Sequence, residues 1–194
     1  MPQPKITTTR LILRPLTSSS SHINLFVDLD ASPIVMKYLE NEPLTPAQAT
    51  ADHASRLDAS TKVDGLGYWV GYLDDKIIGW FSLAPTVVNG AVEATQAEIG
   101  YRLLPGFWRQ GYAKEGARAL MKYGFDELRL HEVWGQTMSV NAASRGTMSA
   151  CGMQLVRRFW VDFEDPVPGT EEGEVEYRIG RDKWEDLADE KRRF

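Results

Sequence analysis

Residues 98–115 contain a glycine-containing turn between a predicted strand and a predicted helix. Gly106 and Gly111 lie in this turn, and the helix begins directly after it. The first turn of a helix carries N–H groups without intrahelical partners and a partial positive charge, and glycine lets a ligand approach the backbone closely. Arg109 and Lys114 add positive charge at the same place. These residue types at this spacing predict a site for a phosphate or pyrophosphate group.

Two common phosphate-binding patterns are absent from the sequence. A nucleotide-binding P-loop needs Gly-x-x-x-x-Gly-Lys-Ser/Thr, and a dinucleotide-binding fold needs Gly-x-Gly-x-x-Gly after its first strand. The turn matches neither pattern. On spacing alone, the alternative that Gly106 and Gly111 only shape a loop stays open.

Length and composition indicate one globular domain over residues 1–194. Hydrophobic residues make up 43% of the chain and charged residues 25%, which are ordinary proportions, and no stretch approaches the roughly 20 apolar residues that cross a bilayer. The first residues lack the features of a secretory or transit signal, so we expect a cytoplasmic location without membrane association. The net charge of −5 does not favour a nucleic-acid partner.

Metal and thiol chemistry find little support in the sequence. The single cysteine, Cys151, excludes an intramolecular disulfide, and the three histidines do not have zinc-ligand spacing. We therefore expect no metal site. Nothing near Cys151 in the sequence would activate its thiol, so we interpret it as a packed helix residue.

Hydrophobic periodicity and turn residues predict a mixed α/β (α+β) domain with a helix crossing between strands four and five. The expected helices are two short ones within residues 22–39, one at 45–57, a long one at 113–128 and a shorter one at 142–151. The expected strands are residues 9–16, 67–73, 77–83, 97–103, 133–140, 153–162 and 174–180.

The run from residue 98 to 153 resembles the acetyl-CoA core of the GNAT superfamily of N-acetyltransferases, and most of all the branch containing ribosomal-protein N-terminal (alanine/serine) acetyltransferases. Three further pieces are similar to that branch: Thr9-Arg10-Leu11-Ile12-Leu13-Arg14-Pro15; Asn141-x-x-Ser144 with Cys151-Gly152-Met153; and Tyr177-Arg178-Ile179 followed by Lys183-Trp184 as a last strand. The resemblance implies a mostly antiparallel seven-stranded sheet flanked by helices, with strands four and five splayed apart.

The resemblance also implies where acetyl-CoA binds. The family's pyrophosphate loop falls on residues 108–113, with Trp108 where Gln or Arg is usual. The backbone amides expected to hold the pyrophosphate belong to Arg109, Gln110, Gly111, Tyr112, Ala113 and Lys114. Backbone groups of Leu103 and Leu104 are expected to pair with the pantetheine arm, an N–H near Leu103 is expected to meet the carbonyl oxygen, and Asn141 is expected near the thioester.

Two side chains are candidates for proton transfer and leaving-group stabilisation. An alkyl amine has a pKa of about 10.4 and must lose a proton to attack, and Glu98 is the candidate general base. Its alternative is a solvated or ion-paired strand residue facing Arg102. The position where the family often has a tyrosine acid is Met148, so Ser144 is the candidate donor to the thiolate, and a helix-capping role is its alternative.

The function that the resemblance implies is transfer of an acetyl group from acetyl-CoA to a primary amine, on a protein N-terminus or a small molecule, by direct attack in a ternary complex. Two alternatives stay open: a non-catalytic acyl-CoA-binding module, and an acyltransferase that uses another acyl-CoA. The acidic stretch between residues 162 and 174 would attract a cationic acceptor or form a solvated loop. Exposed strand edges would permit a homodimer.

Overall fold

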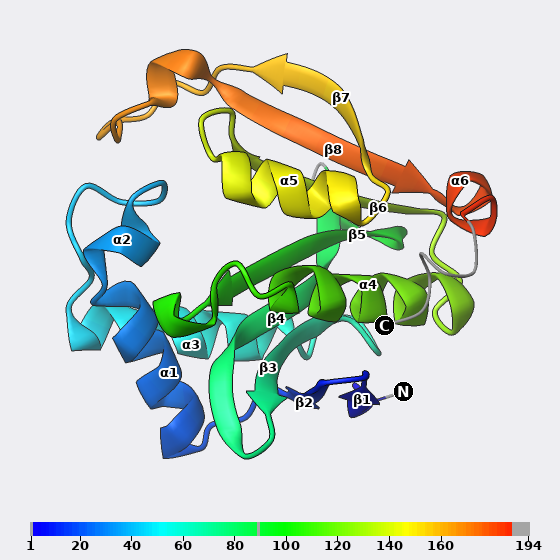
Figure 1. Ribbon diagram of the computed structural model, residues 1–194, viewed down its shortest axis with the longest axis horizontal. Helices are drawn as coiled ribbons and strands as arrows, with labels where there is room; N and C mark the ends of the chain where they lie inside the picture. Colours follow the sequence, from blue (N-terminus) through cyan, green and yellow to red (C-terminus); the bar gives the residue numbers. More distant parts are fainter. Residues whose placement is uncertain (1, 89, 188–194) are drawn as a thin grey trace.

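The computed structural model describes residues 2–88 and 90–187, and within them the structure contains one eight-stranded sheet (Figure 1). The strands are β1 (Ile6–Thr7), β2 (Leu11–Pro15), β3 (Gly67–Leu73), β4 (Lys76–Val88), β5 (Ala91–Leu103), β6 (Glu132–Met138), β7 (Gln154–Phe159) and β8 (Glu174–Gly180). Their order is β1-β2-β3-β4-β5-β6-β8-β7, and only β5 and β6 pair in parallel. Within the described ranges no helix has the length and apolar character that crossing a bilayer requires.

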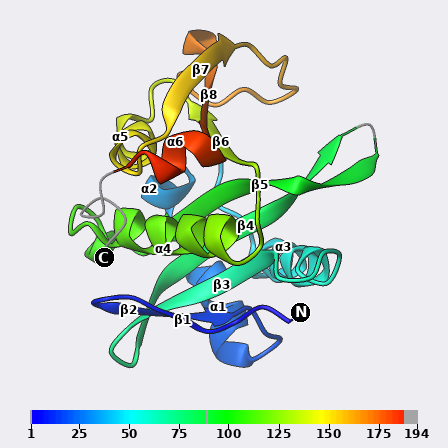
Figure 2. The same cartoon turned by 90° about the vertical axis from the view of Figure 1, so that its right-hand side faces the viewer.

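Helices cover both faces of the sheet. They are α1 (Ser20–Asp30), α2 (Pro33–Met36), α3 (Pro46–Ala59), α4 (Tyr112–Asp126), α5 (Ala142–Ala150) and α6 (Arg181–Glu185), with short 3₁₀ turns at Pro105–Phe107 and Thr170–Glu172. Figure 2 shows α4 on one side of β3 and β4 and α3 on the other.

Neighbouring residues of β4 show how the two faces are built. Phe81 packs towards α4, where it leaves no room for a side chain at Gly116, and Trp80 stacks on Phe26 of α1 with ring centroids 6.2 Å apart. Successive side chains of a strand point to opposite faces, so Phe81 packs in the core on the α4 side and Trp80 in the core on the α1 side. The strand is buried on both sides because helices lie on both sides.

The predicted fold class is confirmed, and three details of the element prediction need correction. The sheet has eight strands, because residues 6–7 add an edge strand too short to show a period in sequence. The strand predicted at residues 97–103 begins at Ala91, as part of a long hairpin with β4. Lys183 and Trp184 lie in α6 instead of extending the last strand, because Trp184 is buried against Phe125 of α4, with ring centroids 5.2 Å apart.

The splay predicted between strands four and five is present. It lies between β5 and β6, because the additional edge strand β1 shifts the numbering by one. β5 and β6 pair only at Gln96–Glu132, Ala97–Val133 and Glu98–Trp134. β5 then continues to Leu103 beside β4, while β6 continues to Met138 beside β8. A gap therefore opens in the middle of the sheet directly after Glu98.

A buried ion pair fixes α1 against β5 beside this gap. The Arg102 guanidinium donates to the carboxylate of Asp30, whose side chain is fully buried at the end of α1. The Arg102 side chain is 13% exposed. Removing one partner of such a pair leaves a buried charge without compensation, which is strongly destabilising.

We predict that Asp30→Ala lowers the free energy of unfolding by about 3 kcal/mol, because it leaves the buried charge of Arg102 without a partner. Urea denaturation followed by tryptophan fluorescence measures this change. Asp28→Ala, the same substitution at an exposed position of α1, is the control and should have little effect. Equal losses in the two variants would show that the ion pair does not hold α1 in place.

Candidate active site

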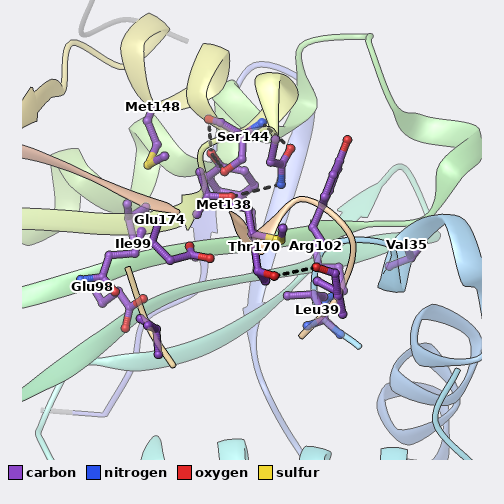
Figure 3. Close-up of a pocket in the computed structure, with 18 of the residues that line it drawn as sticks. Val35, Leu39, Glu98, Ile99, Arg102, Met138, Ser144, Met148, Thr170 and Glu174 are labelled. Carbon is purple, nitrogen blue, oxygen red and sulfur yellow. Dashed lines mark hydrogen bonds between the residues drawn. The ribbon is translucent and has the colours of Figure 1, made fainter. Parts of the chain in front are cut away.

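A cavity of about 570 Å³ lies where β5 and β6 part (Figure 3). Its walls come from β5, β6, β8, α5, the segment around α2 and the loop between β7 and β8. Figure 3 shows Glu98 entering from β5, Ser144 from α5 and Glu174 from β8. The structure thus brings the two predicted proton-handling residues, Glu98 and Ser144, to one cavity from opposite sides of the gap.

Glu98 occupies the last position at which β5 pairs with β6. Burial, and then the charge of Glu176, raise the pKa of Glu98 to about 6. Arg102, its alternative partner, is paired with Asp30 instead. Among the described residues no side chain forms a hydrogen bond or ion pair with Glu98. Its carboxylate is therefore free to accept a proton from a ligand, and its catalytic role stays a prediction.

Glu176, whose charge acts on Glu98, is kept ionised by a network of hydrogen bonds. Burial alone would raise the pKa of Glu176, but hydrogen bonds from Arg157, Arg178 and Gln136 lower it to about 2. Glu176 is 2% exposed and lies between β6 and β7 on β8. It therefore remains a carboxylate at every pH at which Glu98 titrates.

Asn141 and Ser144 begin α5 at the edge of the cavity. Asn141 is the N-cap: its side-chain oxygen accepts the Ser144 N–H (3.2 Å), and its amide nitrogen donates to Thr137 Oγ1 (3.1 Å). The capping role considered for Ser144 thus belongs to Asn141. The Ser144 hydroxyl lies 3.4 Å from the hydroxyl of Tyr101 on β5.

Tyr101 and Met148 complete this side of the cavity. Met148, at the family's usual tyrosine position, is 2% exposed and part of the apolar core. The phenol that meets α5 in the cavity comes instead from Tyr101, and nothing in the spacing of the sequence points from residue 101 to residue 144. Burial also raises the pKa of the Cys151 thiol to about 12, so the prediction that it is a packed residue is confirmed.

The predicted pyrophosphate turn has two residues in the left-handed region, Arg109 (φ 60°) and Gly111 (φ 83°). Gly111 is the N-cap of α4 and has no side chain to satisfy the first-turn N–H groups. Within that turn Arg109, Gln110, Gly111 and Lys114 are exposed. Backbone N–H groups of this geometry form concave anion sites, so the turn fits a pyrophosphate.

Arg10, from the N-terminal segment, contacts this turn and the start of α4. Its guanidinium donates to the Gln110 carbonyl oxygen (3.0 Å), lies over the Tyr112 ring (4.4 Å) and pairs with Glu115, which is 7% exposed. Hydrogen bonds from Thr8 and Arg10 lower the pKa of Glu115 even though burial acts in the opposite direction. Sequence reasoning missed this contact, because the partners lie about a hundred residues apart.

At the end of β5 the Leu103 N–H faces the gap, whereas the Leu104 N–H does not. The Leu104 N–H donates to the Ile78 carbonyl oxygen (2.9 Å), so it is already used within the sheet. Alternation along an antiparallel strand then turns the N–H and C=O of Leu103 away from β4. The Leu103 carbonyl accepts a hydrogen bond from the Trp108 indole (2.6 Å). Of the two residues predicted to pair with pantetheine, Leu103 keeps a suitably directed N–H.

Comparison with known proteins decides the family. A model of the acetyltransferase (GNAT) domain matches residues 10–154. The chain belongs to the GNAT acetyltransferase family. It is therefore an acetyltransferase that uses acetyl-CoA as co-substrate, which agrees with the turn and cavity described above.

One relative covers nearly the whole GNAT chain. It is an Aspergillus fumigatus protein named FsC-acetyl coenzyme A-N(2)-transacetylase, 42% identical over 186 residues, covering 94% of this chain and 78% of the relative.

Two solved structures support the GNAT fold. The spermidine N-acetyltransferase of Vibrio cholerae, in complex with CoA and spermine, has a TM-score of 0.73 at 16% identity and covers 92% of this chain and 100% of its own. The Salmonella typhimurium acetyltransferase that modifies the N-terminal serine of ribosomal protein L7/L12 has a TM-score of 0.70 at 17% identity, covering 89% and 96%. At these identities the likeness concerns the fold alone.

We predict that Gly111→Asp weakens acetyl-CoA binding at least about tenfold, because it places a carboxylate beside the pyrophosphate. Gly111→Asn is the matched control: it has the same shape and tolerates the left-handed conformation, but it carries no charge. Calorimetric titration of both variants measures the difference. Equal affinities would place the pyrophosphate elsewhere.

Proposed function

We propose that this protein transfers an acetyl group from acetyl-CoA to the primary amine of a cationic small molecule, by direct attack of the amine within a ternary complex. The observation that carries this proposal is Glu98, an unpaired carboxylate with a pKa of about 6 at the mouth of the gap between β5 and β6. At neutral pH such a group is mostly ionised and is suited to act as a general base.

The charges of the cavity support a cationic acceptor. Glu98, Glu174 and Asp165 line it, and the charge of Arg102 is compensated by Asp30. Carboxylates in a partly buried cleft raise the local concentration of cations.

The shape of the cavity supports a small acceptor. The side-chain amide of Asn41 donates to Asp165 (2.7 Å), which joins the loop after α2 to the loop between β7 and β8 over the cavity. The relative from A. fumigatus, whose name specifies N(2) transacetylation, covers 94% of this chain. Enclosure by two loops favours a compact acceptor over the end of a folded protein.

The proposed roles of the side chains follow from their places around the gap. As the nitrogen–carbon bond forms, Glu98 accepts the proton that the nitrogen loses. The Leu103 N–H stabilises the charge that develops on the carbonyl oxygen. The carbon–sulfur bond then breaks, its electron pair stays on sulfur, and the Ser144 hydroxyl donates a hydrogen bond to that sulfur. Positioning supplies much of the rate, because a thiolate with a pKa near 8.5 leaves readily.

We predict that Glu98→Gln lowers kcat by about a hundredfold and leaves acetyl-CoA affinity unchanged. In the wild type the rate falls more steeply below a pH of about 6 than titration of the amine alone allows, because Glu98 becomes protonated there. In the variant this additional loss disappears. Steady-state rates across pH measure both effects.

Glu93→Gln, on the same strand but outside the cavity, is the control for Glu98→Gln and should keep wild-type rates. Full activity in Glu98→Gln, or the same additional loss of rate below a pH of about 6 as in the wild type, would show that Glu98 is not the general base.

We predict that small di- or polyamines are acetylated with a kcat/KM at least about tenfold higher than peptide N-termini, because a second positive charge meets Glu174 and Asp165. A thiol-release assay over a panel of both classes, at fixed acetyl-CoA, measures this ratio. Peptides that match or exceed the amines would favour a protein N-terminus as acceptor.

A homodimer and a cytoplasmic location stay predictions. The edge strand β7 is exposed along most of its length, and such an edge can pair with a second copy of the chain. Sedimentation equilibrium would measure the mass in solution.

A further inference from the structure

The hydroxyl of Tyr101 meets the first turn of α5 beside the cavity. It donates to the Ser144 carbonyl oxygen (3.1 Å) and lies 3.4 Å from Ser144 Oγ. Among the described residues Tyr101 is the one hydrogen-bond partner of the Ser144 hydroxyl. Both side chains line the cavity. The first turn of α5, and with it the Ser144 side chain, is therefore held by a residue of another element, 43 positions away in sequence.

Strand geometry places Tyr101 on the face where the coenzyme must lie. Glu98 and Tyr101 are separated by three positions of β5, so their side chains point to opposite faces of the sheet. Ile99 and Leu103, on the same face as Tyr101, pack in the core cluster that includes α4 and Met148 of α5. Tyr101 and Ser144 thus border the gap from the side of α4 and its pyrophosphate turn.

The phenol is suited to donate a hydrogen bond over the whole working range of pH. Burial raises the pKa of Tyr101 well above its ordinary value, so the group keeps its proton. A phenol has one hydrogen to donate. Because that hydrogen goes to the Ser144 carbonyl oxygen, it fixes the backbone from which the serine side chain projects, and the serine hydrogen is left for another acceptor.

We propose that Tyr101 is a positioning residue that holds Ser144 where its hydroxyl can donate a hydrogen bond to the sulfur of CoA, so that the pair stabilises the departing thiolate. The proposal rests on the acetyl transfer proposed above. No proton is transferred by the pair: the electron pair of the broken carbon–sulfur bond stays on sulfur, the amine proton goes to Glu98, and solvent protonates the thiolate after release. The phenol from β5 thereby supplies a group that Met148 on α5 does not.

The first test needs no acceptor. A hydrogen bond to the thiolate lowers the pKa of the CoA thiol in its complex with the protein. Titration of the thiolate's ultraviolet absorbance in that complex should give a thiol pKa below that of free CoA in the wild type. In Tyr101→Phe, which removes only the hydroxyl, this pKa should be higher by about one pKa unit. Tyr123→Phe, the same change on α4 outside the cavity, should match the wild type.

The second test asks whether Tyr101 acts through Ser144. Tyr101→Phe should lower kcat about tenfold at unchanged KM for acetyl-CoA, and Ser144→Ala should lower it at least as much. The double variant should be no slower than Ser144→Ala, because residues that act as a unit are not additive.

Each outcome decides between the two proposals. Losses that multiply in the double variant, or a thiol pKa that is equal in the wild type and Tyr101→Phe, overturn the role of Tyr101 while leaving acetyl transfer intact. A wild type that acetylates no amine, but whose bound thiol responds to Tyr101→Phe as described, overturns the proposed acetyl transfer and supports the contact with sulfur.

Discussion

The whole arrangement depends on a sheet that is joined at its centre by only three residue pairs. β5 is bound to β4 along its length, and β6 is bound to β8 at seven positions, so each strand belongs to its own half-sheet after Glu98. Backbone groups that face the gap lack a strand partner, and buried groups of this kind require one. A ligand that lies in the gap with amide groups of its own supplies it. The same irregularity that weakens the sheet creates the site.

The two half-sheets stay together because one face is covered across the gap. Leu120 and Met121 of α4 belong to the same core cluster as Val133 of β6 and Val175 of β8. On the opposite face, the cluster built on α1 contains residues of β2, β3 and β4 and none of β6 or β8. The gap is therefore covered by a continuous core on the α4 side, whereas on the α1 side, where Glu98 lies, no core cluster joins the two half-sheets.

The ionisation of Glu98, the proposed base, is affected by a second carboxylate, Glu176, which stays ionised throughout the range in which Glu98 titrates. Glu176 is held ionised by Arg157 and Arg178, which lie on its own strand or the next one. Its charge reaches Glu98 across the gap and opposes ionisation there. Without this network, burial alone would act on Glu98. The arginines thus affect the chemistry from a distance, by keeping Glu176 negative.

Sequence reasoning succeeded where local pattern and chemistry coincide. The turn before α4 was predictable because Gly111 allows the left-handed conformation that opens the helix. The place of Glu98 at the cavity followed from its position on β5 just before the splay, and its catalytic role stays a prediction. The contacts of Arg10 with Glu115 and of Tyr101 with Ser144 were not predictable, because each joins elements remote in sequence and neither depends on a repeating pattern. Trp184 was misplaced for a related reason: its burial against Phe125 is a tertiary contact that overrides strand propensity.

The period of two in a β-strand gives β5 two chemically different faces beside the gap. Glu98 and Tyr101 are an odd number of positions apart, so the strand presents a proton acceptor to one face and a hydrogen-bond donor to the other. A shift of register by one residue would exchange these faces and place the carboxylate on the face proposed for the thioester, where its charge would oppose the departing thiolate. The register is set by the pairing of β5 with β4, which runs from Gly79–Leu103 to Ala84–Glu98 without interruption. The continuous pairing of β5 with β4 therefore determines which side chains β5 presents on each face beside the gap.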